Sequence, residues 1–370
     1  MLRCRSDAAA SQTGSVEGEE SMDTCPVPYR GDRWSLAAVV MVGVAAVVVV
    51  VVAVVAGAGG TTVAPAPAPS TPHTPSPTAI PAQPLLGFGF SAVEDPLSHQ
   101  VVVFGGVDSY DTTWLWDGKR WSLAHPRLTP PGRFAAASAY DPLTGLVMLY
   151  GGRLGPGDVV DDTWAWDGRT WAELDSGTGA PPAGEGSVMA WDGVHRQMVL
   201  VNSAGLSAGQ TWLWTGARWA RQQTGALPVG LFVVGMAVDP ATSAFLAVGC
   251  CAPGNSATST WSWDGGAWHQ VSTHADPPAV VGLAADPTGG SLLLCSDPTT
   301  AATGRQVWTW GGSDWIPHAG ARVPVIPEAE VTDVDEGHVL LLGSLVQASQ
   351  GSPQPVHVWS WNGSAWNQQS

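Results

Sequence analysis

The chain has 370 residues, with 45 glycines and 30 prolines but only 12% charged residues. This length and composition suit one large all-β domain of short strands and turns, with additional segments. The formal net charge of −16 argues against nucleic acid as a partner, because phosphate binding needs clustered cations. Fourteen arginines stand beside a single lysine, Lys119, which indicates a GC-rich bacterial source.

Residues 1–34 are polar and show no periodic apolar face. They are predicted to form a disordered cytoplasmic tail. Cys4 and Cys25 lie in this tail without CxxC spacing or a nearby histidine. Two reduced thiols are therefore expected here rather than a metal site.

Residues 35–58 are predicted to form one transmembrane helix. Leu36 to Val55 contains no charged residue, and about twenty apolar residues are enough to cross a bilayer core. Arg30 and Arg33 precede the segment, and the next cation is Lys119, which places the N-terminus in the cytoplasm. A cleaved signal peptide is the alternative, but the long leading segment and long apolar core favour an uncleaved anchor.

Residues 59–84 are rich in proline, threonine, serine and alanine and carry no charge. Alternating prolines favour an extended spacer with no packing face. A domain boundary is therefore expected near Pro84, and residues 85–370 are predicted to fold as one domain.

Six copies of one tryptophan phrase organise residues 85–370. The first copy reads WLWDGKRW, successive copies start 47 to 51 residues apart, and together they hold 18 of the 20 tryptophans. A repeat of about 50 residues is the length of one four-stranded propeller blade. The copies start at Trp114, Trp164, Trp212, Trp261, Trp308 and Trp359.

Each phrase is predicted to be a β-hairpin. Trp114 and Trp116 are two residues apart, so on a strand both side chains leave the same face. Asp117-Gly118 favours a tight turn. A two-residue loop pairs Trp114 with Trp121, whereas a four-residue loop pairs Trp116 with Trp121. Either hairpin places its indoles on one side, which must be buried against a neighbour.

Every repeat begins with an apolar strand that ends at an aspartate turn and is followed by a second apolar strand. With the tryptophan hairpin this makes four strands in each repeat, and no helical period is present. We expect the turn aspartates to cap Asx-type turns rather than to act in catalysis. They are Asp95, Asp141, Asp192, Asp239 and Asp286.

The second repeat, Arg133 to Leu174, resembles the kelch repeat of galactose-oxidase-like propellers. It has an apolar strand closing on Gly151-Gly152, then a tryptophan-bearing strand and a final tryptophan. The resemblance implies a six-bladed kelch-like β-propeller after the transmembrane helix. The chain is expected to begin on an innermost strand and to end on an outermost one, without a strand exchange that closes the ring.

The resemblance also raises the question of a copper oxidase. Copper sites of that family use two tyrosines, two histidines and a cysteine, but Tyr110, Tyr140 and Tyr150 all lie in the first two repeats. A sialidase is the other enzyme considered, but its Asp-box separates Asp from Gly, whereas the two are adjacent here. Inner-strand stretches such as AAASA and VVGLAA offer almost no acids, bases or nucleophiles. No catalytic residue, cofactor or metal is therefore expected.

Three cysteines occupy nearly matching places in neighbouring repeats. A disulfide from Cys295 to either Cys250 or Cys251 is predicted if the domain lies outside the cell. One thiol would then be left over.

The variable segments between the second and third strands are predicted to form the binding face, because binding residues concentrate in loops on a rigid scaffold. The acidic residues of these loops could bind calcium, which prefers oxygen ligands. We favour the alternative that they are ordinary loop carboxylates exposed to solvent. The candidate binding residues are Asp108, Tyr110, Asp111, Arg153, Asp158, Asp161 and Asp162.

These observations favour a single-pass cell-membrane protein that displays the propeller outside the cell. It is expected to act as a binding module for an envelope protein or glycan. One alternative is an extracytoplasmic enzyme of galactose-oxidase-like or sialidase-like type. The other is a structural component of the envelope.

Overall fold

The computed structural model describes residues 83–369, with gaps at 108–110, 156, 176–178, 185, 203–208, 224, 226, 251–256, 276, 279, 288–289, 296–305, 334–335 and 345–353. The predicted tail (1–34), the membrane helix (35–58) and nearly all of the linker (59–84) lie outside these residues. In the described part of the chain, no helix is long and apolar enough to cross a membrane.

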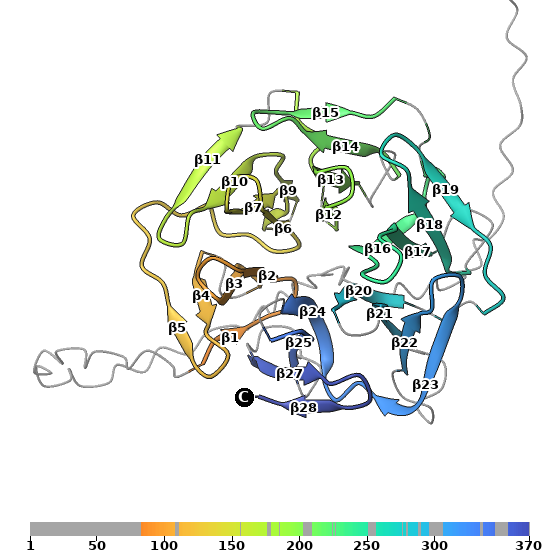
Figure 1. The fold of residues 1–370 in the computed structure, drawn as a ribbon. Coiled ribbons are helices and arrows are strands. Elements are labelled where there is room, and N and C mark those ends of the chain that lie inside the picture. The colour runs from red at the N-terminus through yellow and green to blue at the C-terminus, as the bar shows by residue number, and fades with distance from the viewer. Residues whose placement is uncertain are drawn as a thin grey trace, which may run out of the picture. The chain divides into compact units, whose positions relative to one another are not determined.

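The described strands form six four-stranded antiparallel sheets, one from each sequence repeat (Figure 1). Sheet 1 contains β2 (Ser91–Asp95), β3 (Gln100–Phe104), β4 (Thr113–Trp116) and β5 (Trp121–Leu123). Sheet 2 contains β6 (Ala137–Asp141), β7 (Leu146–Tyr150), β10 (Thr163–Trp166) and β11 (Trp171–Asp175). Sheet 3 contains β12 (Val188–Asp192), β13 (Gln197–Val201), β14 (Thr211–Trp214) and β15 (Trp219–Arg221).

Sheets 4 to 6 repeat this order. Sheet 4 contains β16 (Phe232–Val238), β17 (Phe245–Cys250), β18 (Ser259–Trp263) and β19 (Trp268–Val271). Sheet 5 contains β20 (Val280–Asp286), β21 (Gly290–Cys295), β22 (Gln306–Trp310) and β23 (Trp315–Arg322). Sheet 6 contains β24 (Ile326–Asp333), β25 (His338–Ser344), β27 (His357–Trp361) and β28 (Trp366–Gln368).

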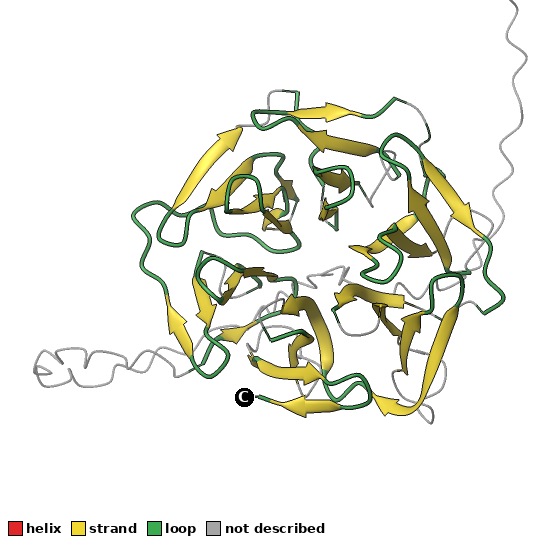
Figure 2. Cartoon of the chain, in the orientation of Figure 1, coloured by secondary structure: helices red, strands yellow, loops and turns green. Residues whose placement is uncertain are grey.

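The first strands of the six sheets surround one axis. β2, β6, β12, β16, β20 and β24 contact one another in this cyclic order, and β24 returns to β2. Within each sheet the later strands lie progressively farther from the axis (Figure 2). The fold is therefore the all-β β-propeller that the repeats predict, with the chain entering each sheet on its innermost strand.

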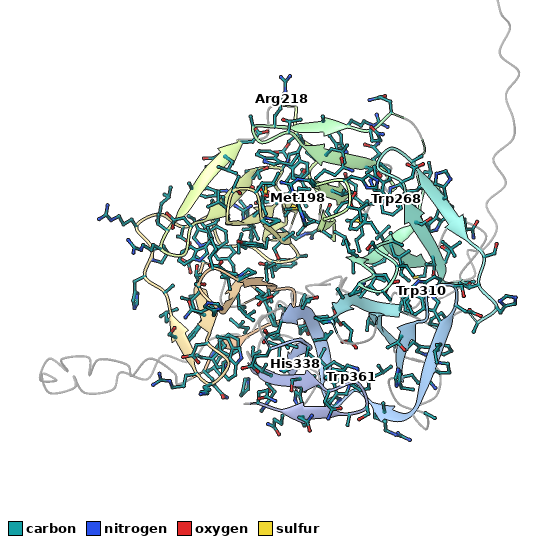
Figure 3. All side chains as sticks on the ribbon, in the orientation of Figure 1. Met198, Arg218, Trp268, Trp310, His338 and Trp361 are labelled. Carbon is teal, nitrogen blue, oxygen red and sulfur yellow. The ribbon has the colours of Figure 1, made fainter. Side chains whose placement is uncertain are left out.

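An apolar cluster fills each interface between neighbouring sheets. Val102 and Phe104 of sheet 1, for example, pack with Leu149 and Trp171 of sheet 2. Equivalent clusters occupy the other five interfaces. Figure 3 shows Arg218 projecting from the outer rim of the ring. Since each sheet buries both faces against its neighbours, the hydrophobic core is distributed around the ring.

The tryptophan hairpins have four-residue loops. Trp116 pairs with Trp121, and their ring centroids lie 5.1 Å apart. The Asp117 carboxylate accepts the backbone N–H groups of Lys119 at 2.9 Å and Arg120 at 2.7 Å. Of the two loops that the sequence allows, the longer one is correct. The same tryptophan pairing recurs in the other five hairpins.

The buried turn aspartates cap the inner hairpins. The Asp95 carboxylate accepts the N–H of Leu97 at 3.1 Å and the hydroxyl of Ser98 at 2.7 Å. Asp141 makes the same two contacts with Leu143 and Thr144. These are the Asx-type turns that the sequence predicts.

Hydrogen bonds from indole to threonine join successive sheets. Trp171 of sheet 2 donates from Nε1 to the hydroxyl of Thr113 in sheet 1, over 3.0 Å. Trp219 bonds to Thr163 in the same way, at 2.9 Å. Two further pairs complete the series, Trp268 with Thr211 and Trp315 with Thr260. Each threonine immediately precedes a tryptophan phrase, so the repeat supplies one such bond for each interface from sheet 1 to sheet 5.

The two interfaces of sheet 6 lack this bond. Valine replaces the threonine in the last two repeats, as Val307 and Val358. The corresponding indoles, Trp366 and Trp121, have buried Nε1 atoms without a hydrogen-bond partner. Val307 and Trp366 belong to one apolar cluster, and Val358 and Trp121 belong to another. A buried donor left unpaired costs about 1–3 kcal/mol, so sheet 6 joins its neighbours less favourably.

Val358→Thr is expected to raise the free energy of unfolding by about 1 kcal/mol, because the new hydroxyl can accept from Trp121 Nε1. Denaturant unfolding of the propeller domain measures the change. Val339→Thr is the matched control, because Val339 is equally buried in sheet 6 but does not precede a tryptophan phrase. The control should destabilise the domain, since a buried hydroxyl without a designed partner is unfavourable. Equal destabilisation by both variants would contradict the prediction.

The first and last sheets are joined by a pair of short strands. β1 (Leu85–Leu86) pairs antiparallel with β26 (Gln354–Pro355). The N–H of Val356 also donates to the carbonyl of Pro84 over 3.2 Å. Every four-stranded sheet takes its strands from a single repeat, so no strand is exchanged between the first and last sheets, and the backbone bonds of β1 with β26 link the two ends of the ring instead. These bonds involve only backbone groups, and backbone pairing leaves no side-chain pattern in so short a segment.

Candidate ligand-binding cavity

A cavity of about 650 Å³ lies where the innermost strands of the six sheets converge. All six of these strands contribute lining residues. Because side chains alternate along a strand, each sheet presents only a few positions to this space. The residue types at those positions therefore determine what the cavity can bind.

The position just before the turn aspartate differs between the two halves of the ring. Sheets 1, 2 and 3 place Glu94, Tyr140 and Trp191 there, and all three line the cavity. At the same position sheets 4, 5 and 6 carry the smaller residues Val238, Ala285 and Thr332. The cavity consequently has an aromatic and acidic wall formed by β2, β6 and β12.

The Tyr140 side chain combines an aromatic ring with a hydroxyl group that is protonated at neutral pH. Burial and the nearby carboxylates of Asp95, Asp141 and Glu94 raise the pKa of its hydroxyl. The hydroxyl therefore keeps its proton and can donate to a ligand. Trp191, in the neighbouring sheet, is only partly buried. Together they supply flat apolar surfaces with a polar group at the edge, the combination that aromatic residues bring to binding sites.

Two glutamates on β24 line the cavity from sheet 6. Glu328 is the extra residue at a register shift between Pro327 and Ala329. Its carboxylate accepts the N–H of Gly89 over 3.2 Å. Glu330 follows two residues later, and its Oε1 atom is buried without a hydrogen-bond partner. Sheet 6 thus brings two carboxyl groups to a space that is otherwise mostly apolar.

Both glutamates are difficult to ionise. Burial raises the pKa of Glu328 to about 7, and the N–H of Gly89 partly offsets this rise. Burial also raises the pKa of Glu330 to about 8, and the neighbouring Glu328 carboxylate contributes to the rise. Removal from water disfavours the charged form of a carboxyl group. At neutral pH Glu330 is therefore mostly protonated.

The expectation that the inner strands carry almost no acids is wrong for sheet 6. Its inner strand reads PEAEVTD, whereas the matching stretches of sheets 4 and 5 read VVGMAVD and VVGLAAD. Aligning the repeats on their turn aspartates would have revealed both glutamates. Glu328 replaces the valines at positions 234 and 281, and Glu330 replaces Met236 and Leu283.

The predicted binding residues lie away from this cavity. Arg153 and Asp158 lie in a short hairpin formed by β8 (Arg153–Gly155) and β9 (Asp158–Val159), where Arg153 pairs with Val159 and Asp158 with Gly155. Asp161 and Asp162 follow after Val160, so these four residues lie together in the connection from β7 to β10 of sheet 2. Asp111 lies in the connection from β3 to β4 of sheet 1, where its carbonyl accepts the hydroxyl of Thr129 over 3.3 Å. Asp108 and Tyr110 fall outside the described residues, and none of the five described ones lines the cavity.

Asp162 has a structural partner. Arg133 is only 1% exposed and donates from Nη2 to the Asp162 carboxylate over 2.9 Å. Trp164 Nε1 donates to the same oxygen over 2.7 Å. Beside it, burial raises the pKa of Asp161, and the charges of Asp162 and Asp175 add to this rise. Asp162 therefore anchors the loop rather than standing open for a ligand.

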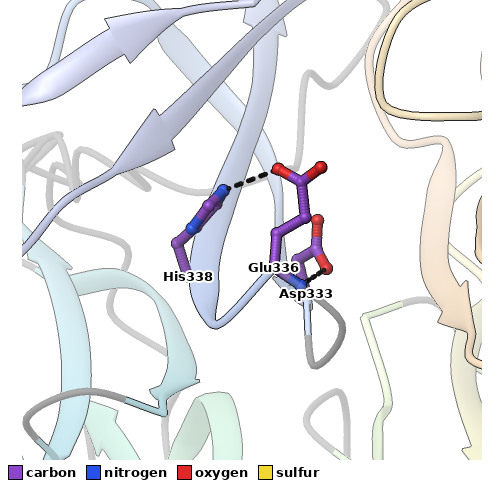
Figure 4. Close-up of side chains that lie close together, drawn as sticks. All are labelled: Asp333, Glu336 and His338. Atoms are coloured by element: carbon purple, nitrogen blue, oxygen red, sulfur yellow. Dashed lines mark hydrogen bonds and ion pairs between the residues drawn. The ribbon is translucent and has the colours of Figure 1, made fainter.

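Within the part of the chain that the structure describes, one group of side chains that could ligate a metal lies at the turn between β24 and β25 (Figure 4). Candidate ligand atoms of Asp333, Glu336 and His338 all lie within 4.8 Å of one another. His338 Nε2 is 3.2 Å from Glu336 Oε2, and the Glu336 N–H donates to Asp333 over 2.9 Å. The Glu336 side chain is 66% exposed, so this group is open to solvent.

The predicted disulfide stays a prediction. Cys250 is buried at the end of β17, and Cys295 ends β21 in the neighbouring sheet. Cys251 and the side chain of Cys295 lie outside the described part of the structure.

No protein-family profile matches the chain, and no curated protein matches it in sequence. The kelch resemblance therefore also stays a prediction. Solved structures do match. The structure of YjhT has a TM-score of 0.53 at 12% identity, over 79% of this chain and 100% of that one. The likeness is one of fold.

Two lectin structures show the same degree of likeness. One is the SapL1 lectin in complex with alpha methyl fucoside, with a TM-score of 0.51 and 14% identity. The other is the Aleuria aurantia lectin, a fungal six-bladed β-propeller with a novel fucose recognition mode, with a TM-score of 0.53 and 15% identity. Each match covers 78% of this chain and 96% of the lectin. Three solved structures thus share the fold of this chain, and one of them is described as a six-bladed β-propeller.

Proposed function

We propose that this protein is a membrane-anchored binding module whose six-bladed, kelch-like propeller binds a glycan outside the cell. The main observation behind this proposal is the aromatic and acidic wall of the central cavity, formed by Glu94, Tyr140 and Trp191. Small-molecule sites are concave and largely apolar, with a few polar groups that fix the ligand's orientation. A sugar ring matches this wall, because its apolar face stacks on an indole while its hydroxyls bond to the carboxylate and phenol.

Two further observations support the proposal. The structural neighbours include two proteins named as lectins, one solved with a fucoside. The uncharged segment from Leu36 to Val55, preceded by Arg30 and Arg33, favours an N-terminus in the cytoplasm and a propeller outside the cell. The proline-rich residues 59–84 would then hold the propeller away from the membrane surface.

Trp191→Ala is expected to weaken glycan binding at least tenfold, about 1.4 kcal/mol, because it removes the largest stacking surface of the wall. A glycan array of neutral, acidic and amino oligosaccharides identifies the ligand for the purified chain, and calorimetry then measures the affinity of both proteins. Trp359→Ala is the matched control. Trp359 is also partly buried but does not line the cavity, so its loss should leave the affinity unchanged.

A thermal melt of each variant checks that the domain is folded. Binding that survives Trp191→Ala would move the site away from the cavity, towards the loops of sheets 1 and 2. An array without any bound glycan would contradict the proposal and favour an envelope protein as the ligand.

A further inference from the structure

We propose that the glycan carries a free amino group and that the glutamates of sheet 6, Glu328 and Glu330, bind this group as an ammonium ion. This inference rests on the proposed function and names the ligand class of the same cavity. It makes the ligand an amino sugar rather than a neutral or acidic oligosaccharide.

The charge of the cavity supports a cationic ligand. Among the described residues, the cavity is lined by the carboxyl groups of Glu94, Glu328 and Glu330 and by no lysine, arginine or histidine. An anionic ligand would face these groups without a compensating cation. Glu330 Oε1 is buried and unpartnered, and a neutral ligand would supply no charge that favours the ionised form of this carboxyl group. An ammonium group supplies both the charge and the hydrogen-bond donors that paired carboxylates require.

The position of Glu330 is unusual within the repeat. A Cβ atom placed on Gly282 of β20 would overlap the Glu330 carboxyl group, so this group lies against the backbone of sheet 5. In the preceding interface the backbone and Cβ of Leu283, the residue at the matching position, lie against Gly235. A glutamate has thus replaced an apolar side chain at a packed interface. Burial of an unpaired carboxyl group is unfavourable for folding. A bound cation would pair with this carboxyl group and so explain why a glutamate occupies the position.

The opposite wall of the cavity is compatible with such a ligand. Indole and phenol faces attract cations as well as apolar sugar faces, and Trp191 and Tyr140 provide both. The sugar ring can therefore stack on sheets 2 and 3 while its ammonium group reaches sheet 6. Glu94 of sheet 1 stands between these two walls in the order of the ring.

The test compares two probes that differ only in the amine. The β-1,4-linked glucosamine trimer carries free amino groups, and the N-acetylglucosamine trimer has each amine blocked. The full chain should bind the glucosamine trimer at least tenfold more tightly in calorimetry at neutral pH. Glu328→Gln and Glu330→Gln should each remove most of this preference. Glu336→Gln is the matched control, because Glu336 is an exposed glutamate of the same sheet outside the cavity, and it should retain the full preference.

Glu330→Met provides a second variant, because methionine occupies the matching position of sheet 4. It should fold with unchanged secondary structure and lose the same preference. Equal binding of the two trimers, or a preference that survives both glutamine variants, would overturn the inference and leave glycan binding in the cavity standing. If the array shows no bound glycan at all, the proposed function fails as well.

Discussion

Arg133→Ala is expected to lower the free energy of unfolding of the propeller by about 3–5 kcal/mol, the cost of breaking a buried ion pair by removing one partner. The Arg133 side chain is fully buried and the Asp162 side chain is 16% exposed. The guanidinium also donates to the carbonyls of Gly151 and Pro131, both at 3.0 Å. Its removal would leave the Asp162 carboxylate and two carbonyls without these donors.

Equilibrium unfolding in urea measures this effect, and Arg120→Ala is the matched control. Arg120 also pairs with an aspartate, Asp117, but at 3.9 Å and with a side chain that is 86% exposed. Exposed pairs contribute only about 0–1 kcal/mol. Similar losses in the two variants would show that the buried pair has no special role. The loop that carries Asp158 and Asp161 should also become sensitive to proteases in Arg133→Ala.

Glu330→Gln is expected to stabilise the propeller increasingly as the pH rises from 5 to 9, by on the order of 2 kcal/mol at the upper end. The pKa of Glu330 is raised from 4.5 to about 8 on folding. The folded state therefore holds a proton that the unfolded state has released. This contribution to stability is fully present below pH 4.5 and is lost as the pH rises towards 8. Glutamine cannot ionise, so the variant avoids that loss.

Unfolding free energies at pH 5 and pH 9 test this expectation. The quantity of interest is the difference between variant and wild type at each pH, because other groups titrate in both proteins. A difference for Glu330→Gln that is constant from pH 5 to pH 9 would show that Glu330 is ionised throughout this range. Water would then hydrate the Glu330 carboxylate more fully than the mostly apolar lining of the cavity indicates.

The sequence by itself determined the architecture of residues 85–370. Period-two apolar strands, aspartate turns and paired tryptophans recur in every repeat, and a strand with these features can only be stable when its faces are covered by neighbours. Repeated local signals therefore specified the four-stranded sheets and the order of strands from the axis outwards. They also predicted the roles of Asp95 and Asp141, because an Asx-type turn is made within a few residues of its own aspartate.

Contacts between distant segments were decided only by the tertiary structure. The pairing of β1 with β26 depends on backbone groups that meet only when sheet 6 returns to sheet 1. The partner of Asp162 is Arg133, 29 residues away, and no local pattern distinguishes this pair from solvated loop charge. Glu328 and Glu330 were visible in the sequence as a departure from the repeat. Their raised pKa values and their place in the cavity follow from burial among six converging strands, which is a property of the closed ring and not of any one repeat.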